Sequence, residues 1–444
     1  MPEYLDPKAA SIQPSFPLQV SPNEVTALSL RANFSWTFVG NVVYAGCQWG
    51  MLVVLAKLGS PETVGLFALG LAVTAPVIQF VNLQLRGAQV TDAAHEYQFG
   101  DYLGLRLTTT TLALLIIAGI VSVSRYQLDA ALVIMLIGIA KAIESISDVY
   151  YGMFQQHECM EYIATSMMIK GLLSLLLLGL GFYLSNSLFW GLLGIIVSWS
   201  VILLTYDIPK GVHIAALHSQ TAAMRPRWSV QTLLRLAWTV LPLGMVMLLI
   251  SLNTNIPRYV IEQHYGVRHL GIFAALSYLI VAGTTVVSAL GQSASPRLAK
   301  YYAAGNSTGF QHLLLTLVGI GLLLGGAGTL VAWVAGQEIL TLLYQPEYAT
   351  YTNVFVLLTI SAGLGFVASF LGCGMTAARY FRAQFPLFLL VTGTVAVACF
   401  LIIPSQGLYG AAVALIIANT VQIISSMAVI AHALRRLQGR AGRS

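Results

Sequence analysis

Long apolar stretches alternate with short polar segments along almost the whole chain after residue 30. A helix that crosses a bilayer needs about 20 consecutive, mostly apolar residues. The chain offers twelve such stretches, near residues 34–56, 63–84, 104–124, 128–152, 163–184, 187–207, 232–253, 268–291, 311–334, 352–375, 384–403 and 408–432. They must be helices, because backbone amides in lipid have no other local hydrogen-bond partner.

The first six spans and the last six share a sequence pattern. Gly65 and Gly271 occupy similar stretches 206 positions apart, and Gly100 and Gly305 lie 205 positions apart. An even number of spans in each copy gives both copies the same orientation. We therefore predict an all-α polytopic membrane protein whose 12 transmembrane helices form two parallel six-helix bundles. A pseudo-two-fold axis along the membrane normal would relate the bundles, with the substrate path between them.

Composition agrees with a membrane protein. Hydrophobic residues make up 57% of the chain and charged residues 9%, against roughly 25% charged residues in soluble domains. With the N-terminus in the cytoplasm, cytoplasmic segments hold sixteen Lys and Arg residues and the opposite face holds four. This bias predicts that both termini are cytoplasmic. The net charge of +6 is thus an orientation signal and does not indicate nucleic-acid binding.

These boundaries give five expected segments. Residues 1–27 form a cytoplasmic N-terminal tail without the apolar core of a signal peptide. Residues 28–208 form the N-terminal bundle and residues 231–434 the C-terminal bundle, joined by a cytoplasmic linker at 209–230. A basic cytoplasmic tail covers residues 435–444.

Several functions are excluded by what the segments between spans lack. The longest extracytoplasmic loops, expected near 254–267 and 335–351, are too short for the acidic sites of membrane glycosyltransferases. The chain has no phosphate-binding loop for ATP, and its four cysteines have neither metal-ligand spacing nor a disulfide pattern. We expect a transporter rather than an enzyme, without a cofactor. Coupling to an H⁺ or Na⁺ gradient stays open.

Polar residues inside the spans carry the functional signal. In span four, polar residues recur at intervals of three and four, which places them on one helical face. They are Lys141, Glu144, Asp148, Tyr151 and Gln155. Lys170 enters span five at about the depth of Asp148. Charges at this depth cost about 3 kcal/mol each on insertion scales unless they face protein or water. They form either an ion-paired staple between spans four and five or the wall of a hydrated cavity, and we favour the cavity.

Other spans have polar faces of their own. Span one carries Asn33, Thr37, Asn41, Tyr44 and Gln48; span two Gln79, Asn82, Arg86 and Gln89; span seven Ser251, Asn255 and Arg258; span eight Tyr278, Thr285, Ser288 and Gln292. One polar face usually means helix–helix hydrogen bonding, but four on corresponding helices of both copies favour a shared cavity. Span ten, the counterpart of span four, carries no charge, which favours a functional role for the charges in the first copy.

Several motifs resemble those of a known superfamily. They are Leu83-Gln-Leu-Arg-Gly-Ala-Gln-Val-Thr-Asp92, Tyr97-Gln-Phe-Gly-Asp-Tyr-Leu-Gly-Leu-Arg106, Asn253-Thr-Asn-Ile-Pro-Arg258 and Ser288-Ala-Leu-Gly-Gln-Ser-Ala-Ser-Pro-Arg-Leu-Ala-Lys300. With them the chain resembles the polysaccharide-type (O-antigen flippase-like) members of the multidrug/oligosaccharidyl-lipid/polysaccharide exporter superfamily. The likeness covers nearly all of residues 30–434.

The resemblance implies a V-shaped pair of six-helix bundles that work by alternating access in the bacterial inner membrane. The implied cargo is an oligosaccharide unit on a polyprenyl pyrophosphate, used for exopolysaccharide, O-antigen or lipopolysaccharide synthesis. Membrane lipids would be partners, together with a polysaccharide polymerase and the chain-length machinery. The lipid II flippases of the superfamily have two C-terminal spans beyond the twelve that we expect here.

The residues that we expect to contact cargo are amides and basic side chains, which suit sugar hydroxyls and phosphates. They are Arg31, Asn41, Gln48, Arg86, Lys141, Lys170, Asn255, Arg258 and Gln292. Arg31 and Arg86 would capture phosphate at the cytoplasmic mouth, or else extend to lipid headgroups. Glu144 and Asp148 are the candidates for a coupling ion.

Two alternatives remain open at this point. A cation-coupled drug exporter of the same fold would use Glu144 and Asp148 as its ion site, yet four basic residues (Arg86, Lys141, Lys170, Arg258) outnumber these two acids and favour an anionic cargo. A non-transporting membrane scaffold of a polysaccharide synthesis complex would have a dry, fully paired interior.

Overall fold

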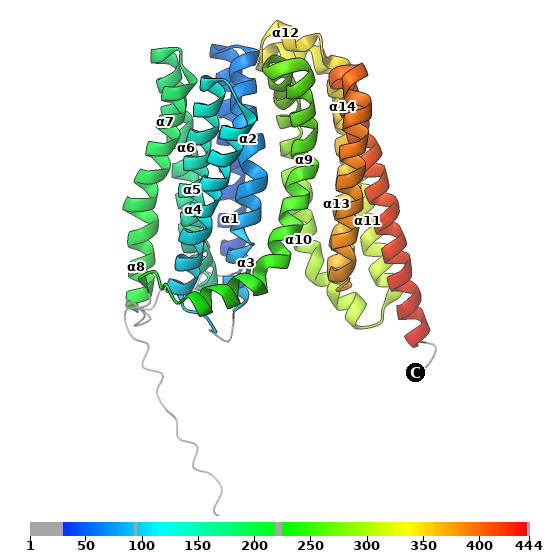
Figure 1. Ribbon diagram of the computed structural model, residues 1–444. Helices are drawn as coiled ribbons and strands as arrows, with labels where there is room; N and C mark the ends of the chain where they lie inside the picture. The colour runs from blue at the N-terminus through cyan, green and yellow to red at the C-terminus, as the bar shows by residue number, and fades with distance from the viewer. Residues whose placement is uncertain (1–29, 93–95, 218–223, 442–444) are drawn as a thin grey trace, which may run out of the picture.

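The computed structural model describes residues 30–92, 96–217 and 224–441. Within these ranges the regular elements are helices and no strand occurs. Ten of the described helices are long and apolar enough to cross a membrane, and they stand roughly side by side (Figure 1). This is the architecture of a multi-pass membrane protein, as the hydrophobic pattern predicts.

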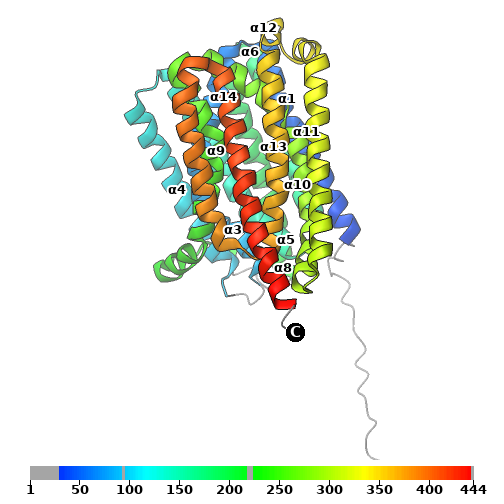
Figure 2. The same cartoon turned by 90° about the vertical axis from the view of Figure 1, so that its right-hand side faces the viewer.

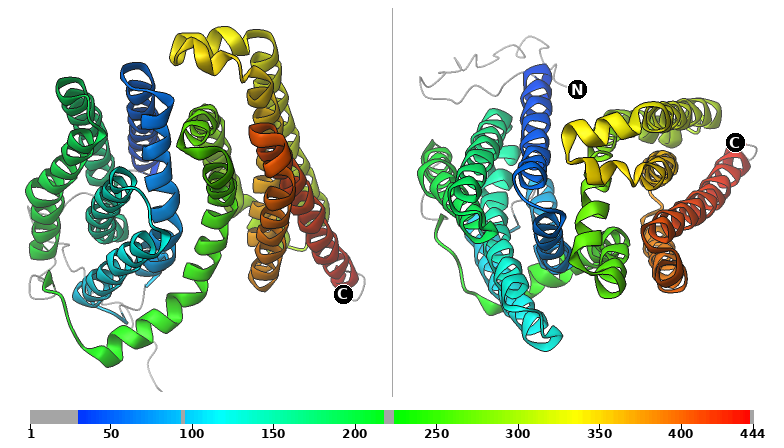
Figure 3. Two further views of the ribbon diagram at one scale, coloured as in Figure 1. Left: turned by 45° about the horizontal axis from the view of Figure 1, so that its top comes forward. Right: turned by 90° about the horizontal axis from the view of Figure 1, so that it is seen from above.

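The helices of the first half are α1 (Leu30–Leu58), α2 (Pro61–Asn82), α3 (Leu85–Thr91), α4 (Phe99–Ser124), α5 (Leu128–Gln156), α6 (Met160–Ser185), α7 (Leu188–Ile202), the π-helical turn η1 (Leu203–Asp207) and α8 (Ile208–Leu217). The second half comprises α9 (Val230–Tyr278), α10 (Val281–Ala303), α11 (Ser307–Leu343), α12 (Pro346–Ala349), α13 (Thr352–Ala377) and α14 (Phe381–Ala441). Seen from above, α9 lies between the helices of the two halves (Figure 3).

Two long helices are interrupted by glycines. Gly266 in α9 has φ 77°, and Gly407 in α14 has φ 59°; both values favour glycine, which has no Cβ to clash. The two breaks fall where the sequence predicts the turns between spans seven and eight and between spans eleven and twelve. The orange first part and the red second part of α14 accordingly run side by side (Figure 2).

A different break separates α2 from α3. Leu83 and Gln84 adopt φ values of 53° and 50° in succession, a left-handed conformation that is unfavourable for residues other than glycine. The chain changes direction here, so the polar positions of the predicted second span do not share one continuous face. Gln89 in α3 is buried and lies against Gly152 of α5, where a Cβ would be 2.3 Å from the Gln89 side-chain amide.

The two halves meet closely at the end of the molecule where α12 lies (the α12 end), opposite the C-terminus (Figure 1). A Cβ on Gly65 would be 1.9 Å from the carbonyl oxygen of Val267, and a Cβ on Gly271 would be 1.9 Å from that of Pro61. Both glycines therefore allow α2 and α9 to approach each other backbone to backbone. The two positions that mark the sequence repeat thus lie at the same contact.

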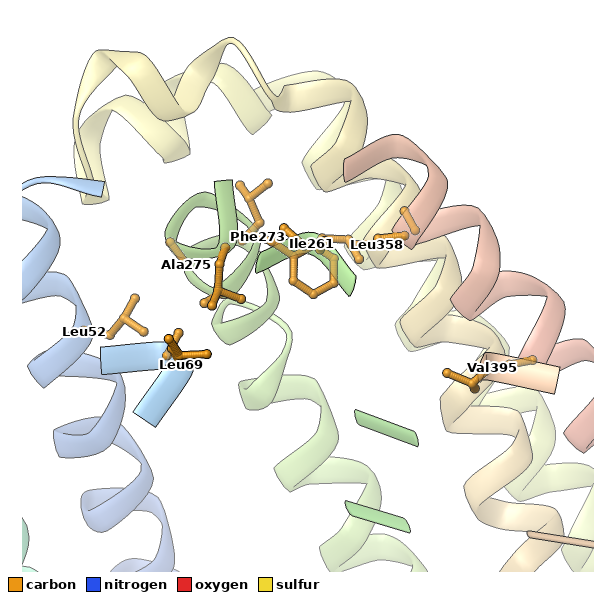
Figure 4. Close-up of a cluster of buried hydrophobic side chains, with 14 of the residues drawn as sticks. Leu52, Leu69, Ile261, Phe273, Ala275, Leu358 and Val395 are labelled. Atoms are coloured by element: carbon orange, nitrogen blue, oxygen red, sulfur yellow. The ribbon is translucent and has the colours of Figure 1, made fainter. Parts of the chain in front are cut away.

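One apolar core spans this contact. It contains residues from the first half, such as Leu52 and Leu69, and residues from the second half, such as Phe273 and Leu358 (Figure 4). At its rim, Arg268 pairs with Glu62 at 2.6 Å and with Glu347 of α12. Apolar packing and ion pairs together close the α12 end.

The described parts of the segment that joins the halves make defined contacts. Its first part is helix α8, and its last part packs on the start of α4, where the Arg227 amide donates to the Gly100 carbonyl at 2.9 Å. A Cβ on Gly104 would be 2.2 Å from the Arg227 carbonyl oxygen, and the Arg227 guanidinium lies 3.6 Å from Asp101. The Gly-Asp-Tyr-Leu-Gly motif thus binds the connection between the halves.

The two expected extracytoplasmic loops were wrong. Residues 254–265 continue α9, and α11 extends to Leu343, followed by the short helix α12. The physical reason is that α9 carries Asn255 and Arg258 on an inward face, so these polar residues lie within the fold. The predicted N-terminal tail lies outside the described residues, and the predicted C-terminal tail continues α14 as far as Ala441.

Candidate functional site

A cavity of about 870 Å³ lies between the halves, with walls from α1, α2, α3, α5, α6 and α9. We call it the charged cavity because six charged residues line it. They are Arg86, Lys141, Glu144, Asp148, Lys170 and Arg258. The sequence separates these residues by up to 172 positions, yet folding brings all six to one space. The binding of cargo or of a coupling ion by these residues stays a prediction.

The polar face of α5 forms the wall of this cavity in the first half. Lys141, Glu144, Asp148, Tyr151 and Gln155 all line it, which confirms the prediction from their helical spacing. Lys170 contacts α5 through hydroxyl groups and not through the expected ion pair: its ammonium lies 2.8 Å from Ser147 Oγ and 3.0 Å from Tyr151 Oη, whereas its carboxylate partner is Asp207 of η1. The cavity is thus present, and hydrogen bonds take the place of the expected ion-paired link between spans four and five.

Glu144 is held at the junction of α5 and α1. Its Oε1 accepts a hydrogen bond from the Tyr44 hydroxyl at 2.6 Å, and its Oε2 accepts one from Lys141 Nζ at 2.7 Å. The side chains of Lys141 and Glu144 are 28% and 29% exposed. The Lys141 ammonium also lies 5.2 Å from the Trp199 ring centre. Lys141 therefore keeps access to the cavity while its charge is balanced.

Asp148 lies between two guanidinium groups. Arg106 Nη2 is 3.1 Å from one carboxylate oxygen, and Arg86 Nη1 is 3.6 Å from the other. Arg106 is fully buried and also donates to Asn82. Arg86 is 30% exposed, and its Nε donates to Gln155 at 3.0 Å. Asp148 thus orients the accessible Arg86 and balances the inaccessible Arg106.

Lys170 has a different environment. Besides Ser147 and Tyr151, its ammonium contacts Asp207 Oδ2 at 3.2 Å, and both charged side chains are at most 2% exposed. Asp207 is the last residue of the π-helical turn η1, a local widening of the helix that often occurs at functional positions. An ammonium has three donors, and all three are used here.

Arg258 and Asn255 lie on the face of α9 that lines the charged cavity. Arg258 Nη1 donates to Asn255 Oδ1 at 3.1 Å, and Asn255 donates to the backbone oxygen of Ser251 at 2.8 Å. Among the described residues, Arg258 Nε is buried without a hydrogen-bond partner. A buried unpaired donor is costly, so this guanidinium has an N–H group available to donate to a ligand oxygen.

Three of the predicted residues are not placed in the lining of either cavity. Asn41 is exposed and donates to Thr37 of its own helix at 2.8 Å. Gln48 is partly buried in α1 but is not among the lining residues. The side chain of Arg31 lies outside the described part of the structure, although its backbone belongs to α1. None of these positions gains support as a binding residue.

A second cavity, of about 760 Å³, lies within the second half and contains the predicted residue Gln292. Met247, Ile250, Thr254 and Arg258 of α9 line both cavities, so the two spaces share a wall. We call the second one the neutral cavity, because Arg258 at this shared wall is the one charged residue among those that line it.

Arg106 and Asp207 are the important residues that sequence reasoning missed. Each lies at the end of a predicted span, where counting of basic residues assigned Arg106 to the cytoplasmic side. Asp207 is the sole charged residue of the predicted span 187–207, and that isolation was the available signal. No comparable signal in the sequence links Arg106 to Asp148, because their pairing depends on how α4 packs against α5.

Comparison with known proteins assigns this architecture to a family. The sequence profile of the polysaccharide biosynthesis protein family matches residues 30–302. The chain belongs to this family. It is 30% identical over 399 residues to the capsular polysaccharide biosynthesis protein CapF of Staphylococcus aureus, covering 88% of this chain and 97% of that one.

Solved structures with the same fold are transporters. One is the inward-facing conformation of a multidrug resistance MATE family transporter of the MOP superfamily, with TM-score 0.64, 13% identity, and coverage of 94% of this chain and 97% of that one. An outward-facing conformation of such a transporter has TM-score 0.58, 13% identity, and coverage of 93% and 96%. The likeness to these transporters shows that the chain shares their fold, and the protein is a multi-pass membrane protein of the polysaccharide biosynthesis family.

Proposed function

We propose that this protein moves polyprenyl-pyrophosphate-linked oligosaccharide units across the bacterial inner membrane for the synthesis of a surface polysaccharide. The observation that carries the proposal is the excess of basic residues in the charged cavity, where four basic side chains meet two acids. A cavity with a net positive charge favours an anionic cargo. In a family of polysaccharide biosynthesis, the diphosphate of a lipid carrier supplies such an anion.

The contacts divide the basic residues into two groups. Arg86, Lys141 and Arg258 line the cavity and are only partly buried, so they are the residues we assign to diphosphate capture. Lys170 uses its donors on Ser147, Tyr151 and Asp207, and we assign it a positioning role.

We further propose that two six-helix bundles rock about the closed α12 end to give alternating access. The close approach of Gly65 and Gly271, which are equivalent in the sequence repeat, supports a pseudo-two-fold axis near this contact. The excess of Lys and Arg in segments at the opposite end supports a cytoplasmic location for that end. With the α12 end closed, the charged cavity would receive cargo from the cytoplasm. The polymerase would act on the unit after its export.

The drug-exporter alternative is less well supported. A site for cationic drugs or for a coupling cation needs an available carboxylate, whereas Glu144 is bonded to Lys141 and Tyr44, and Asp148 to two arginines. The scaffold alternative requires a dry, paired interior. Two cavities of several hundred Å³ and the unpaired Nε of Arg258 do not agree with it.

Lys141→Ala is the sharpest test. Charge-assisted hydrogen bonds contribute roughly 1.5–3 kcal/mol each, so losing one should weaken diphosphate capture by about 10- to 100-fold. Lipid-linked saccharide should then accumulate in the cytoplasmic leaflet while the protein remains abundant in the membrane. Lys141→Arg should retain part of the export rate, because it keeps the positive charge.

Lys57→Ala provides the matched control. Lys57 lies at the α12 end, where its ammonium contacts the Thr341 carbonyl at 3.4 Å, and it lines neither cavity. Export at the wild-type rate in Lys141→Ala would reduce Lys141 to an ion-pair partner of Glu144 and remove the main support for the proposal.

A further inference from the structure

The neutral cavity has the chemistry of a site for uncharged polar groups. Five amide side chains line it: Asn253, Gln292, Gln384, Asn419 and Gln422. Seven serine and threonine hydroxyls join them. Amides and hydroxyls both donate and accept hydrogen bonds, as sugar hydroxyls do. Its volume of about 760 Å³ falls within the roughly 300–1,000 Å³ of small-molecule sites.

Two groups in its wall lack a partner. Among the described residues, Asn253 Oδ1 and Arg258 Nε are buried and make no hydrogen bond, although buried polar groups are normally satisfied. Both residues line the neutral cavity. One group is an acceptor and the other a donor, so a ligand that offers both kinds of atom would satisfy them together. A sugar hydroxyl is such a ligand.

The packing of the second half keeps this wall polar. Asn419 of α14 donates through its amide nitrogen to the Ser361 carbonyl at 2.9 Å and to the Ser361 hydroxyl at 3.1 Å. This fixes the amide between α13 and α14 and leaves its oxygen as an acceptor. Gly365 lies beside it, with the Asn419 amide nitrogen 3.6 Å from the position of a Cβ. The absence of a side chain there leaves space next to the amide.

The shared wall links this cavity to the charged one. Thr254 and Arg258 line both cavities, and they lie one helical turn apart on α9. A ligand could therefore place a diphosphate among Arg86, Lys141 and Arg258 and extend a covalently attached group past α9. The first half supplies charge and the second half supplies neutral hydrogen bonding.

We propose that the neutral cavity is the saccharide subsite of the transporter, where uncharged sugar residues bind while the diphosphate of the same molecule occupies the charged cavity. This inference rests on the proposed function, because it takes a lipid-linked saccharide as the cargo. It adds that selectivity for the glycan resides in the second half, on α9, α10, α13 and α14. Arg258 would contact the junction between the two parts of the cargo.

Binding to purified protein in nanodiscs tests the inference with two probes. One is sugar-free undecaprenyl diphosphate, and the other is the lipid-linked saccharide extracted from producer cells that lack this gene. The wild type should bind the saccharide probe at least about 10-fold more tightly. Gln292→Met and Asn253→Leu each remove hydrogen-bonding groups and keep a similar side-chain volume. Each should therefore weaken the affinity for the saccharide probe by about 3- to 10-fold and leave the affinity for the sugar-free probe unchanged.

Gln337→Met is the matched control, because Gln337 is exposed on α11 and lines neither cavity. Unchanged affinity for the sugar-free probe also shows that a variant is folded. If one of the two cavity variants does not fold, Gln422→Met takes its place in the test. Equal wild-type affinities for the two probes, or equal weakening of both by the cavity variants, would overturn the subsite. Two other outcomes would instead contradict the proposed function. Producer cells that lack this gene would accumulate no lipid-linked saccharide, or the Lys141→Ala variant would bind both probes with the affinity of the wild type.

Discussion

Asp148 has two arginine partners of very different exposure, and this makes its replacement informative. Arg106 is fully buried, whereas Arg86 reaches the cavity. Removing the carboxylate leaves a buried cation with Asn82 as its remaining partner, which costs about 3–5 kcal/mol. Asp148→Asn should therefore lower the apparent unfolding temperature in detergent by several degrees. Glu144→Gln is the control and should lower it less, because Lys141 is 28% exposed and can be solvated. An equal decrease in unfolding temperature in the two variants would show that the buried charge of Arg106 does not need the Asp148 carboxylate.

The same two acids allow a test of ion coupling. Both are ion-paired in this state, so an acid that separates from its partner in the other state could bind a proton there. If Asp148 does so, Asp148→Asn should abolish the dependence of transport on pH in reconstituted vesicles, with rates normalised to folded protein. An unchanged pH profile in the double variant Glu144→Gln, Asp148→Asn would leave both acids as structural partners of the basic residues.

At the scale of elements, the start of α4 holds the connection between the halves. Gly104→Ala would place a Cβ 2.2 Å from the Arg227 carbonyl oxygen, which the backbone cannot accommodate without moving. The connecting segment should then detach, and trypsin should cleave it after Arg227 several-fold faster, whereas Pro226 protects the bond after Arg225. Gly119→Ala in the same helix is the matched control, since a Cβ there meets open space. Cleavage at the wild-type rate would show that this contact does not hold the segment.

The local pattern of the sequence predicts the elements and one wall of the site. The spacing from Lys141 to Gln155 places five residues on one side of α5, and the structure has all five in the charged cavity. Spacing along one helix cannot predict partners on another helix. Asp207 and Arg106 were missed for this reason, because their contacts with Lys170 and Asp148 arise from packing. The left-handed residues Leu83 and Gln84 also escaped notice, since neither is a typical residue for that conformation.

At the scale of the whole molecule, the α12 end should be a gate. Arg268 pairs with Glu62 and Glu347, and such exposed pairs contribute about 1 kcal/mol or less each. Arg268→Glu would place three carboxylates together and should shift the equilibrium towards a form that is open at this end. Spin labels at Leu58 and Leu342, both exposed, should report a longer distance in this variant.

Controls separate the gate from a general effect of charge. Combining Arg268→Glu with Glu62→Arg restores one pair and should return most of the distance distribution to that of the wild type. Arg125→Glu changes the charge of an exposed residue elsewhere and should have no effect. Identical distance distributions in Arg268→Glu and the wild type would show that apolar packing alone keeps this end closed.

The excess of positive charge in the cavity also has an electrical consequence. The cavity balances much of the charge of a bound diphosphate, and its basic residues stay with the protein when the cargo leaves. Each cycle in the proposed direction would then carry about two negative charges out of a cell whose interior is negative. A membrane potential of 100 mV contributes about 2.3 kcal/mol for each elementary charge moved. Voltage alone would thus favour export, and the transporter would need no second ion to give its cycle a direction.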